Sequence, residues 1–83
     1  MSKLRKYIVV KGVVQGVGFR PFVYKIAIDN NLKGWVNNNS KGVFIDIEGS
    51  LINLENFIND LKYKEPPLSQ IKQVAIEDRE VLN

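Results

Sequence analysis

The sequence predicts an α+β fold in which two amphipathic helices cover one face of an antiparallel sheet. Segments rich in β-branched residues alternate with two segments of helical periodicity, in the order β-α-β-β-α-β. Each helical segment carries one apolar stripe, so both helices can be buried on the same side of a sheet. A run of turn-forming residues at 37–42 joins two strands as a hairpin. This order and layering define the ferredoxin-like sandwich, the split βαβ fold.

The first strand and helix flank a glycine-rich loop. Residues Tyr7–Val14 are rich in β-branched side chains and are predicted to form a strand. Pro21 is suited to the first turn of a helix, which is predicted to span Pro21–Leu32 and to end near Gly34. Its apolar face at helical spacing comprises Phe22, Val23, Ile26 and Ala27.

A hairpin follows the first helix. A short second strand begins at Trp35 and Val36, and the turn formers at 37–42 connect it to a strand over Gly42–Glu48. That third strand alternates cleanly, which is typical of an antiparallel strand with one buried face. Its predicted inward residues are Val43, Ile45 and Ile47, and its predicted outward residues are Asp46 and Glu48.

The second helix and the last strand complete the pattern. Ser50 is a suitable N-cap for a helix over Leu51–Tyr63, and Pro66-Pro67 prevents its continuation. Its apolar stripe comprises Leu51, Leu54, Phe57, Ile58 and Leu61. A fourth strand is predicted over Ile71–Asp78, with Val74 and Ile76 facing the core.

Composition narrows the chemistry. The 83 residues form one domain (1–83), with 45% hydrophobic and 25% charged residues, typical of a globular protein. The chain has no cysteine and no histidine, which excludes disulfides, thiolate catalysis and an imidazole base and disfavours a zinc site. Chemistry must come from charged and amide side chains, hydroxyls and backbone amides.

The charge and hydropathy patterns indicate the compartment. A net charge of +3 favours anionic ligands but falls short of the basic stripe of a dedicated nucleic-acid binder. The basic N-terminus precedes an apolar run that Lys11 and Gly12 interrupt, so it does not match a secretory signal. No apolar run approaches the length of a membrane span. We expect a cytoplasmic protein without a membrane partner.

The loop between the first strand and helix is a candidate anion site. Successive amides in a glycine-rich turn can point into one concavity, and a helix N-terminus adds donors and partial positive charge. Arg20 stands at the junction with a guanidinium that matches phosphate or carboxylate oxygens. The alternative is a plain tight turn with a solvated arginine. Pro21 replaces the third glycine of a dinucleotide fingerprint, and the chain has no Walker loop.

Asn38, at the end of the second strand, is the second candidate. The end of this strand could return near the loop, and a neutral amide can orient a water molecule by accepting one hydrogen bond and donating another. The alternative is an ordinary turn residue within the run Asn37-Asn38-Asn39-Ser40.

The blocks "GVVQGVGFR" and "LKGWVNNNSKGVFIDIEG" resemble those of the acylphosphatase family, and the resemblance runs from about residue 5 to residue 78. It implies a ferredoxin-like domain that hydrolyses carboxyl-phosphate anhydrides without metal or cofactor. Arg20 matches the phosphate-binding arginine, and Asn38 matches the asparagine that positions the attacking water. The phosphate cradle would consist of the amides of Gln15, Gly16, Val17, Gly18, Phe19 and Arg20.

A finer resemblance concerns "VQGVGFRPFVYKIA" and "PPLSQI", which are similar to the N-terminal domain of the HypF carbamoyltransferases of [NiFe]-hydrogenase maturation. It implies carbamoyl phosphate as substrate, further domains downstream and a hydrogenase-maturation partner protein. The chain would then be an excised domain or, alternatively, a free-standing relative. Acylphosphatases often have one more short C-terminal strand, of which residues 79–82 would supply a part or none. Asn39 and Ser40 replace other polar residues common beside the family asparagine.

Two other functional classes compete with an acyl phosphate hydrolase. A non-catalytic module would bind an anion in the same cradle, or dock within its parent enzyme, without turnover. An RNA-binding ferredoxin-like domain would need stacking aromatic side chains on the open sheet face. The third strand offers Phe44, but Asp46 and Glu48 would repel a phosphate backbone. We therefore expect a small acyl phosphate, and no nucleic acid, as the ligand.

Overall fold

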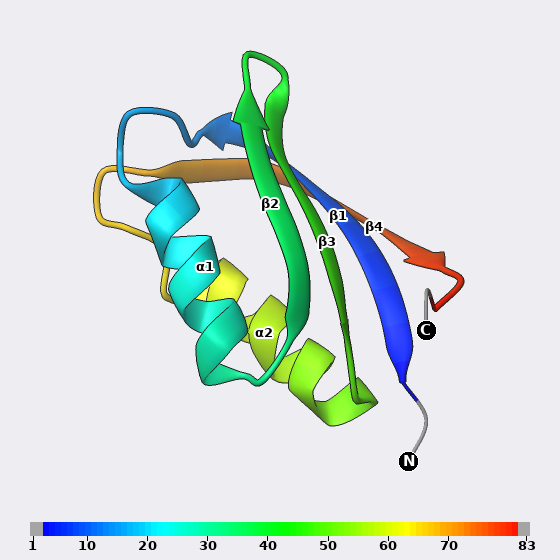
Figure 1. Ribbon diagram of the computed structural model, residues 1–83. Helices are drawn as coiled ribbons and strands as arrows, with labels where there is room; N and C mark the ends of the chain where they lie inside the picture. Colours follow the sequence, from blue (N-terminus) through cyan, green and yellow to red (C-terminus); the bar gives the residue numbers. More distant parts are fainter. Residues whose placement is uncertain (1–2, 82–83) are drawn as a thin grey trace.

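Two helices lie against one face of an antiparallel sheet in the computed structural model, which describes residues 3–81 (Figure 1). The sheet order β2-β3-β1-β4, with each neighbouring pair antiparallel, confirms the predicted ferredoxin-like topology. The elements are β1 (Leu4–Val13), α1 (Phe19–Asp29), β2 (Lys33–Asn39), β3 (Gly42–Gly49), α2 (Leu51–Tyr63) and β4 (Gln70–Arg79).

The core lies between the sheet and the two helices. Residues paired across antiparallel strands share a face, and Ile8 and Val10 of β1 lie opposite Ile45 and Val43 of β3. All four are fully buried. The other buried apolar side chains are Val14, Phe19, Val23, Ile26, Leu32, Ile47, Leu54, Phe57 and Leu61, so the alternation predicted for the third strand and most of both helical stripes are confirmed.

Helix α1 begins at Phe19 and ends at Asp29, earlier at both ends than the predicted Pro21–Leu32. Gly18 is its N-cap, so Pro21 does lie in the first turn, as predicted. The helix stops early because Asn31 adopts a left-handed φ of 57°. The Leu32 amide donates to the carbonyl of Ala27, which turns the buried Leu32 side chain back towards the core.

Strand β2 is longer than predicted. The sequence favoured a strand that started at Trp35 with a connection over 37–42, but β2 spans Lys33–Asn39 and pairs with β3 along its whole length. The turn is confined to Ser40 and Lys41. Asparagine has a low strand propensity, and pairing with β3 overrides it here. This extension fixes the face on which each asparagine lies.

Helix α2 matches its predicted span, and the Oγ of Ser50 caps it by accepting a hydrogen bond from the Asn53 amide at 3.3 Å. Two expected core residues are exposed: Leu51 by 51% and Ile76 by 42%. Leu51 lies in the first turn of α2, at the end of the sheet (Figure 1). Ile76 lies on the edge strand β4 and faces the helix layer. The helices contact mainly β2 and β3, so they leave Ile76 partly uncovered.

Hydrogen bonds from the Asn30 side chain, which follows α1, connect the two helices. The Asn30 side-chain amide donates to the Ile26 carbonyl at 2.8 Å and to Oδ2 of Asp60 at 3.0 Å. This hydrogen bond from Asn30, together with Lys64, lowers the pKa of Asp60 below its ordinary value despite an opposing desolvation effect.

Residues 79–81, for which the sequence left open part of a fifth strand or none, form no additional strand. Arg79 belongs to β4, Glu80 and Val81 are irregular, and Leu82 lies outside the described residues. Within residues 3–81, neither helix has the length and hydrophobicity needed to cross a bilayer.

Candidate active site

The loop between β1 and α1 is anchored at both ends. Val14 and Phe19 are each only 1% exposed, and Val17 packs against the core between them. The Phe19 ring also contacts the Phe22 ring edge-on, with centroids 5.5 Å apart. These anchors hold the exposed part of the loop in one place, which a ligand site requires.

The backbone of this loop has the conformation expected of an anion cradle. Gly16 and Gly18 have φ angles of 71° and 77°, in the left-handed region that favours glycine. A Cβ built at either position would meet no atom within 4 Å, so this part of the loop faces open space. Among the described residues, the amides of 15–20 donate to no backbone carbonyl. The loop therefore presents a run of free donors of the kind that bind anions.

Arg20 is the second residue of α1 and is exposed. In the described part of the chain, its guanidinium makes neither a hydrogen bond nor an ion pair, and the first turn of α1 contains no acidic residue. Its charge is thus not neutralised by a protein carboxylate. It lies beside the loop amides at the positive end of the helix, where an anion is favoured.

The three consecutive asparagines have different roles. Asn38 is half-buried and lies opposite Val43, whose side chain points into the core, so Asn38 faces the helix layer. Asn37 and Asn39 are exposed on the other face. The Oδ1 of Asn39 accepts a hydrogen bond from the Lys41 amide at 2.7 Å. The turn-residue interpretation therefore applies to Asn39, and not to Asn38.

The fold brings these groups to one end of the molecule. The C-terminal ends of β1 and β2 and the N-terminus of α1 lie together in Figure 1. A polar cavity of about 270 Å³ is lined by Val14 and Gln15 on the loop side and by Ser40 and Lys41 on the hairpin side. No hydrogen bond joins Arg20 to Asn38 within the described residues, which leaves both side chains available to a ligand. The described residues contain no cluster of three or more acidic groups arranged to hold a metal ion.

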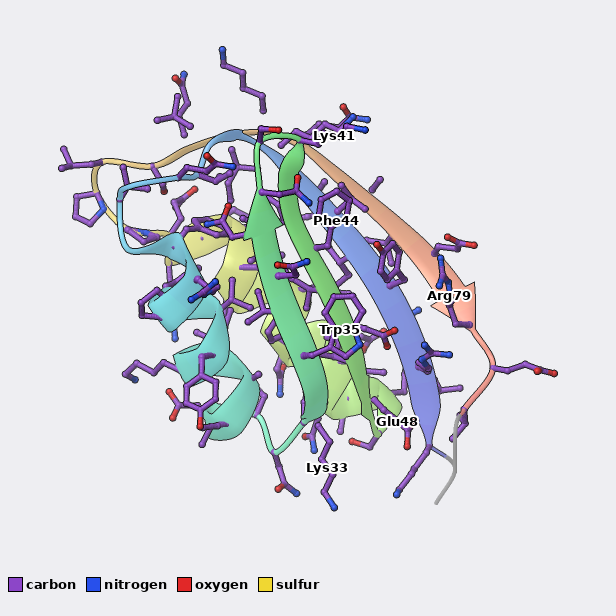
Figure 2. The ribbon with its side chains drawn as sticks, turned by 45° about the horizontal axis from the view of Figure 1, so that its top comes forward. Lys33, Trp35, Lys41, Phe44, Glu48 and Arg79 are labelled. Carbon is purple, nitrogen blue, oxygen red and sulfur yellow. The ribbon has the colours of Figure 1, made fainter. Side chains whose placement is uncertain are left out.

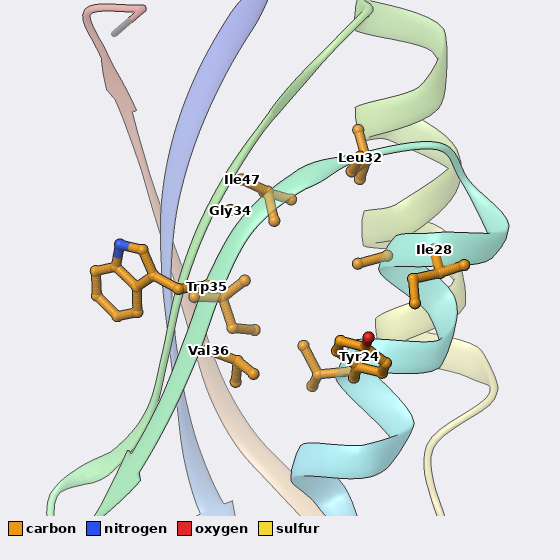
Figure 3. A pocket seen from close by; sticks show the side chains of 10 residues that line it. Tyr24, Ile28, Leu32, Gly34, Trp35, Val36 and Ile47 are labelled. Carbon is orange, nitrogen blue, oxygen red and sulfur yellow. The ribbon is translucent and has the colours of Figure 1, made fainter.

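A second depression has the wrong chemistry for phosphate. It lies between Tyr24 and Ile28 on α1 and Gly34 and Val36 on β2, with Ile47 on its floor, and its volume is about 270 Å³ (Figure 3). None of its lining residues has a charged side chain, so it offers no charged group to an anion. We call this depression the α1–β2 groove.

The open face of the sheet carries an aromatic cluster that the sequence analysis missed. The Tyr7 ring lies near those of both Trp35 and Phe44, at centroid distances of 6.2 and 6.4 Å. The Arg79 guanidinium lies 4.1 Å from the centroid of the Tyr7 ring. Figure 2 shows Trp35, Phe44 and Arg79 on this face of the sheet. The alternation of side chains along β1 and β2 could have indicated the face on which each aromatic residue lies. Only the strand order shows that these residues are neighbours.

On the open face of the sheet, the negative charge of Asp46 is balanced by a paired arginine, so it repels anions less than the sequence suggested. It is only 5% exposed and receives two hydrogen bonds from Arg5, from Nε at 2.8 Å and from a terminal nitrogen at 2.5 Å. This pairing raises the pKa of the Arg5 guanidinium. Glu48 lies 3.9 Å from the Lys3 ammonium. The expectation that this face rejects nucleic acid stays a prediction, and both of its carboxylates have a cationic partner.

Comparison with known proteins identifies the family. A family model described as Acylphosphatase matches residues 6–83. The chain belongs to the acylphosphatase family. It is 41% identical over 78 residues to an acylphosphatase of Methanospirillum hungatei, which covers 93% of this chain and 86% of that protein.

This acylphosphatase-family chain is also similar to part of much larger proteins. It is 59% identical over 76 residues to a probable carbamoyltransferase HypF of Methanocaldococcus jannaschii, covering 92% of this chain and 10% of that protein. A crystal structure of full-length HypF in its phosphate- and nucleotide-bound form superposes with a TM-score of 0.95 and 44% identity, over 98% of this chain and 11% of that one. The chain thus spans about a tenth of the length of these carbamoyltransferases.

Proposed function

We propose that this acylphosphatase-family domain hydrolyses acyl phosphates. The amides of residues 15–20 and the Arg20 guanidinium hold the phosphoryl group, and the Asn38 amide orients the attacking water. The observation that carries the proposal is the run of loop amides beside the Arg20 guanidinium at the start of α1, neither of which has a protein partner among residues 3–81. The family to which the chain belongs supports a hydrolase acting on this class of anhydride.

The reaction needs little from the protein beyond charge stabilisation and positioning. Water attacks phosphorus, the bond from phosphorus to the acyl oxygen breaks, and the carboxylate leaves with the bonding electrons. The proton of the water can pass to a phosphoryl oxygen of the substrate, so no histidine or cysteine is required. The loop amides and Arg20 stabilise the charge on the phosphoryl oxygens in the transition state. Asn38 reduces the entropic cost of placing the water.

Carbamoyl phosphate is the specific substrate that we propose. The support is the 59% identity to a protein described as a carbamoyltransferase and the superposition on full-length HypF. In this proposal the domain acts in the cytoplasm within a larger carbamoyltransferase, beside further domains and a hydrogenase-maturation partner. A free-standing acylphosphatase is the alternative, supported by the similarity to the Methanospirillum hungatei enzyme over most of its length.

Arg20→Ala tests the proposed activity. The residue is exposed and unpaired in the described structure, so the variant should remain folded by circular dichroism. We expect its kcat/KM for benzoyl phosphate to fall by at least about 100-fold, on the scale of a lost oxyanion donor. Lys62→Ala, at an exposed position in the last turn of α2, is the matched control and should keep the full rate. A folded Arg20→Ala variant with an unchanged rate would refute the assignment.

A phosphate-binding module without turnover is the competing function, because the same cradle would serve it. In that case inorganic phosphate would raise the melting temperature of the wild type, as any ligand of the folded state does. Neither benzoyl phosphate nor carbamoyl phosphate would then be hydrolysed above its spontaneous rate. Phosphate release from carbamoyl phosphate, compared with benzoyl phosphate, separates this module from the proposed hydrolase and reports the substrate preference.

A further inference from the structure

The polar cavity between the loop and the hairpin turn adjoins the phosphate cradle. Its volume is about 270 Å³, and it is lined by Gly12, Val13, Val14, Gln15, Ser40, Lys41 and Gly42. Gln15 belongs to both features, because it lines the cavity and is also the first residue of the cradle. An acyl phosphate joins its acyl group to phosphorus through a single oxygen atom. A phosphoryl group held by the loop amides therefore leaves the acyl group within reach of this cavity.

Close backbone packing fixes both walls of the cavity. A Cβ at Gly42 would collide with the Val10 carbonyl oxygen, so the start of β3 lies close against β1. On the other wall, the register of β1 against β4 shifts between Lys11 and Gly12. Such bulges redirect a strand and are frequent beside active sites. The hairpin turn and the loop are thus held by the sheet itself, as a substrate subsite requires.

The charge of the cavity favours an anion. Among residues 3–81, Lys41 has the only charged side chain that lines it, and the Lys41 ammonium makes neither an ion pair nor a hydrogen bond. Figure 2 shows Lys41 at the turn between β2 and β3. Ser40 adds a hydroxyl beside it. Because no described carboxylate lines this space, the positive charge of Lys41 is available to a ligand, and a hydrogen bond from it would be charge-assisted.

The direction of the reaction is compatible with an acyl group in this cavity. In phosphoryl transfer the attacking and leaving oxygen atoms lie roughly in line, on opposite sides of phosphorus. Asn38, which would orient the water, faces the helix layer and does not line the cavity. A substrate whose acyl group occupies the cavity therefore leaves the Asn38 side of the phosphoryl group open to the water.

We propose that this cavity receives the acyl group of the substrate and that the Lys41 ammonium stabilises the departing carboxylate. As the bond from phosphorus to the acyl oxygen breaks, that oxygen takes the bonding electrons, and Lys41 donates a hydrogen bond to it while keeping its proton. This role rests on the proposed hydrolysis and makes Lys41 a third catalytic side chain beside Arg20 and Asn38. Because a more basic carboxylate gains more from a positive charge, acyl phosphates of weak acids depend most on Lys41.

The dependence of the rate on the leaving group tests this role. Para-substituted benzoyl phosphates have the same shape near phosphorus but release acids of different pKa. Lys41→Met should lower kcat/KM for the weakest leaving acid by roughly 10-fold, the scale of a lost charge-assisted hydrogen bond. It should also steepen the decline of kcat/KM with the pKa of the leaving acid, which a merely structural defect would not do. Lys41→Arg should restore most of the rate, and Lys62→Met, at an exposed lysine outside the cavity, should keep the wild-type slope.

Two anions distinguish a failure of this role from a failure of the proposed function. Inorganic phosphate reports on the cradle alone, whereas phosphonoacetate adds a carboxylate where the acyl group would lie. In calorimetric titrations Lys41→Met should weaken phosphonoacetate by roughly 10-fold and leave the affinity for phosphate unchanged. Equal leaving-group slopes in the wild type and Lys41→Met, or equal affinities for phosphonoacetate, would overturn the role of Lys41. A wild type that binds both anions but hydrolyses no acyl phosphate would instead refute the proposed function, and the phosphonoacetate comparison would still decide the anion subsite.

Discussion

Replacing the three asparagines of β2 one at a time separates the candidate catalytic amide from the turn. Asn38 faces the helix layer and is half-buried, whereas Asn37 and Asn39 lie exposed on the opposite face. Each Asn→Ala change removes the same atoms from adjacent positions. A difference between the variants therefore reports the face and the contacts of each residue, and not its chemistry.

The structure gives a different magnitude for each variant. Asn39→Ala removes the 2.7 Å hydrogen bond to the Lys41 amide, which at an exposed site stabilises by about 0.5–1 kcal/mol. That corresponds to a fall of about 4 °C in melting temperature for a domain of this size. Asn38 has no hydrogen-bond partner among the described residues, so its loss should change the unfolding free energy by no more than about 0.5 kcal/mol. If it orients the water, kcat should fall on the order of 100-fold.

Thermal unfolding and steady-state hydrolysis of benzoyl phosphate measure the two effects on the same samples. We expect Asn38→Ala to lose activity with its stability retained, Asn39→Ala to lose stability with its kcat retained, and Asn37→Ala to resemble the wild type. Equal losses of kcat in Asn38→Ala and Asn39→Ala would refute the assignment, because the geometry of the turn would then control the rate. Full activity in Asn38→Ala would exclude that residue from the reaction.

Two further predictions concern stability. A Cβ at Gly12 would collide with the Gln70 carbonyl oxygen in the β1–β4 bulge, whereas a Cβ at Gly18 meets nothing within 4 Å. In urea titrations Gly12→Ala should therefore lower the free energy of unfolding by about 2–4 kcal/mol. Gly18→Ala should lower it by only about 1 kcal/mol, because of the left-handed φ of Gly18. Similar losses in the two variants would contradict this. The pKa of Asp60 is lowered in the folded state, chiefly by the Asn30 hydrogen bond, from an ordinary value of 3.8. The ionised Asp60 carboxylate therefore stabilises the fold above that value, and this stabilisation disappears as the pH falls through the folded-state pKa. The melting temperature of Asp60→Asn should consequently depend less on pH below about 4 than that of the wild type.

The order and type of the elements could be predicted because they depend on local periodicity. The alternation over Gly42–Glu48 and the stripe containing Leu54 and Leu61 appear in the buried positions of β3 and α2. The boundaries of α1 and β2 were less accurate. A left-handed Asn31 ends α1, and pairing with β3 extends β2 through its asparagines. Both effects depend on contacts with other segments, which propensity does not contain.

The candidate site also has one part that local sequence could predict and one part that depends on strand register. The cradle residues and Arg20 are contiguous in sequence, so a strand, a glycine-rich loop and a helix start were sufficient to predict their proximity. Asn38 was a candidate because of its place at the end of the predicted second strand, but only the family resemblance favoured this role over that of an ordinary turn residue. The register of β2 against β3 separates Asn38 from its neighbours, since a shift by one residue would turn a different asparagine towards the helix layer.

The surface features outside the cradle depend wholly on the tertiary structure. Arg5 and Asp46 are 41 residues apart in the chain and meet only because β1 pairs with β3. The cluster of Tyr7, Trp35 and Phe44 requires three strands in the order β2-β3-β1. The α1–β2 groove requires that β2 lie at the edge of the sheet beside α1. No pattern within a single segment contains this information.

The sequence by itself determined the layered α+β architecture, the lack of cysteine and histidine side chains, and a glycine-rich loop that leads into a helix beginning near Arg20. These properties follow from composition and from periodicities shorter than one element. The tertiary structure alone decided that Asn38 is the asparagine on the side of the helices and that Arg5 pairs with Asp46. The physical reason is that strand register and strand order place residues distant in sequence on a common face.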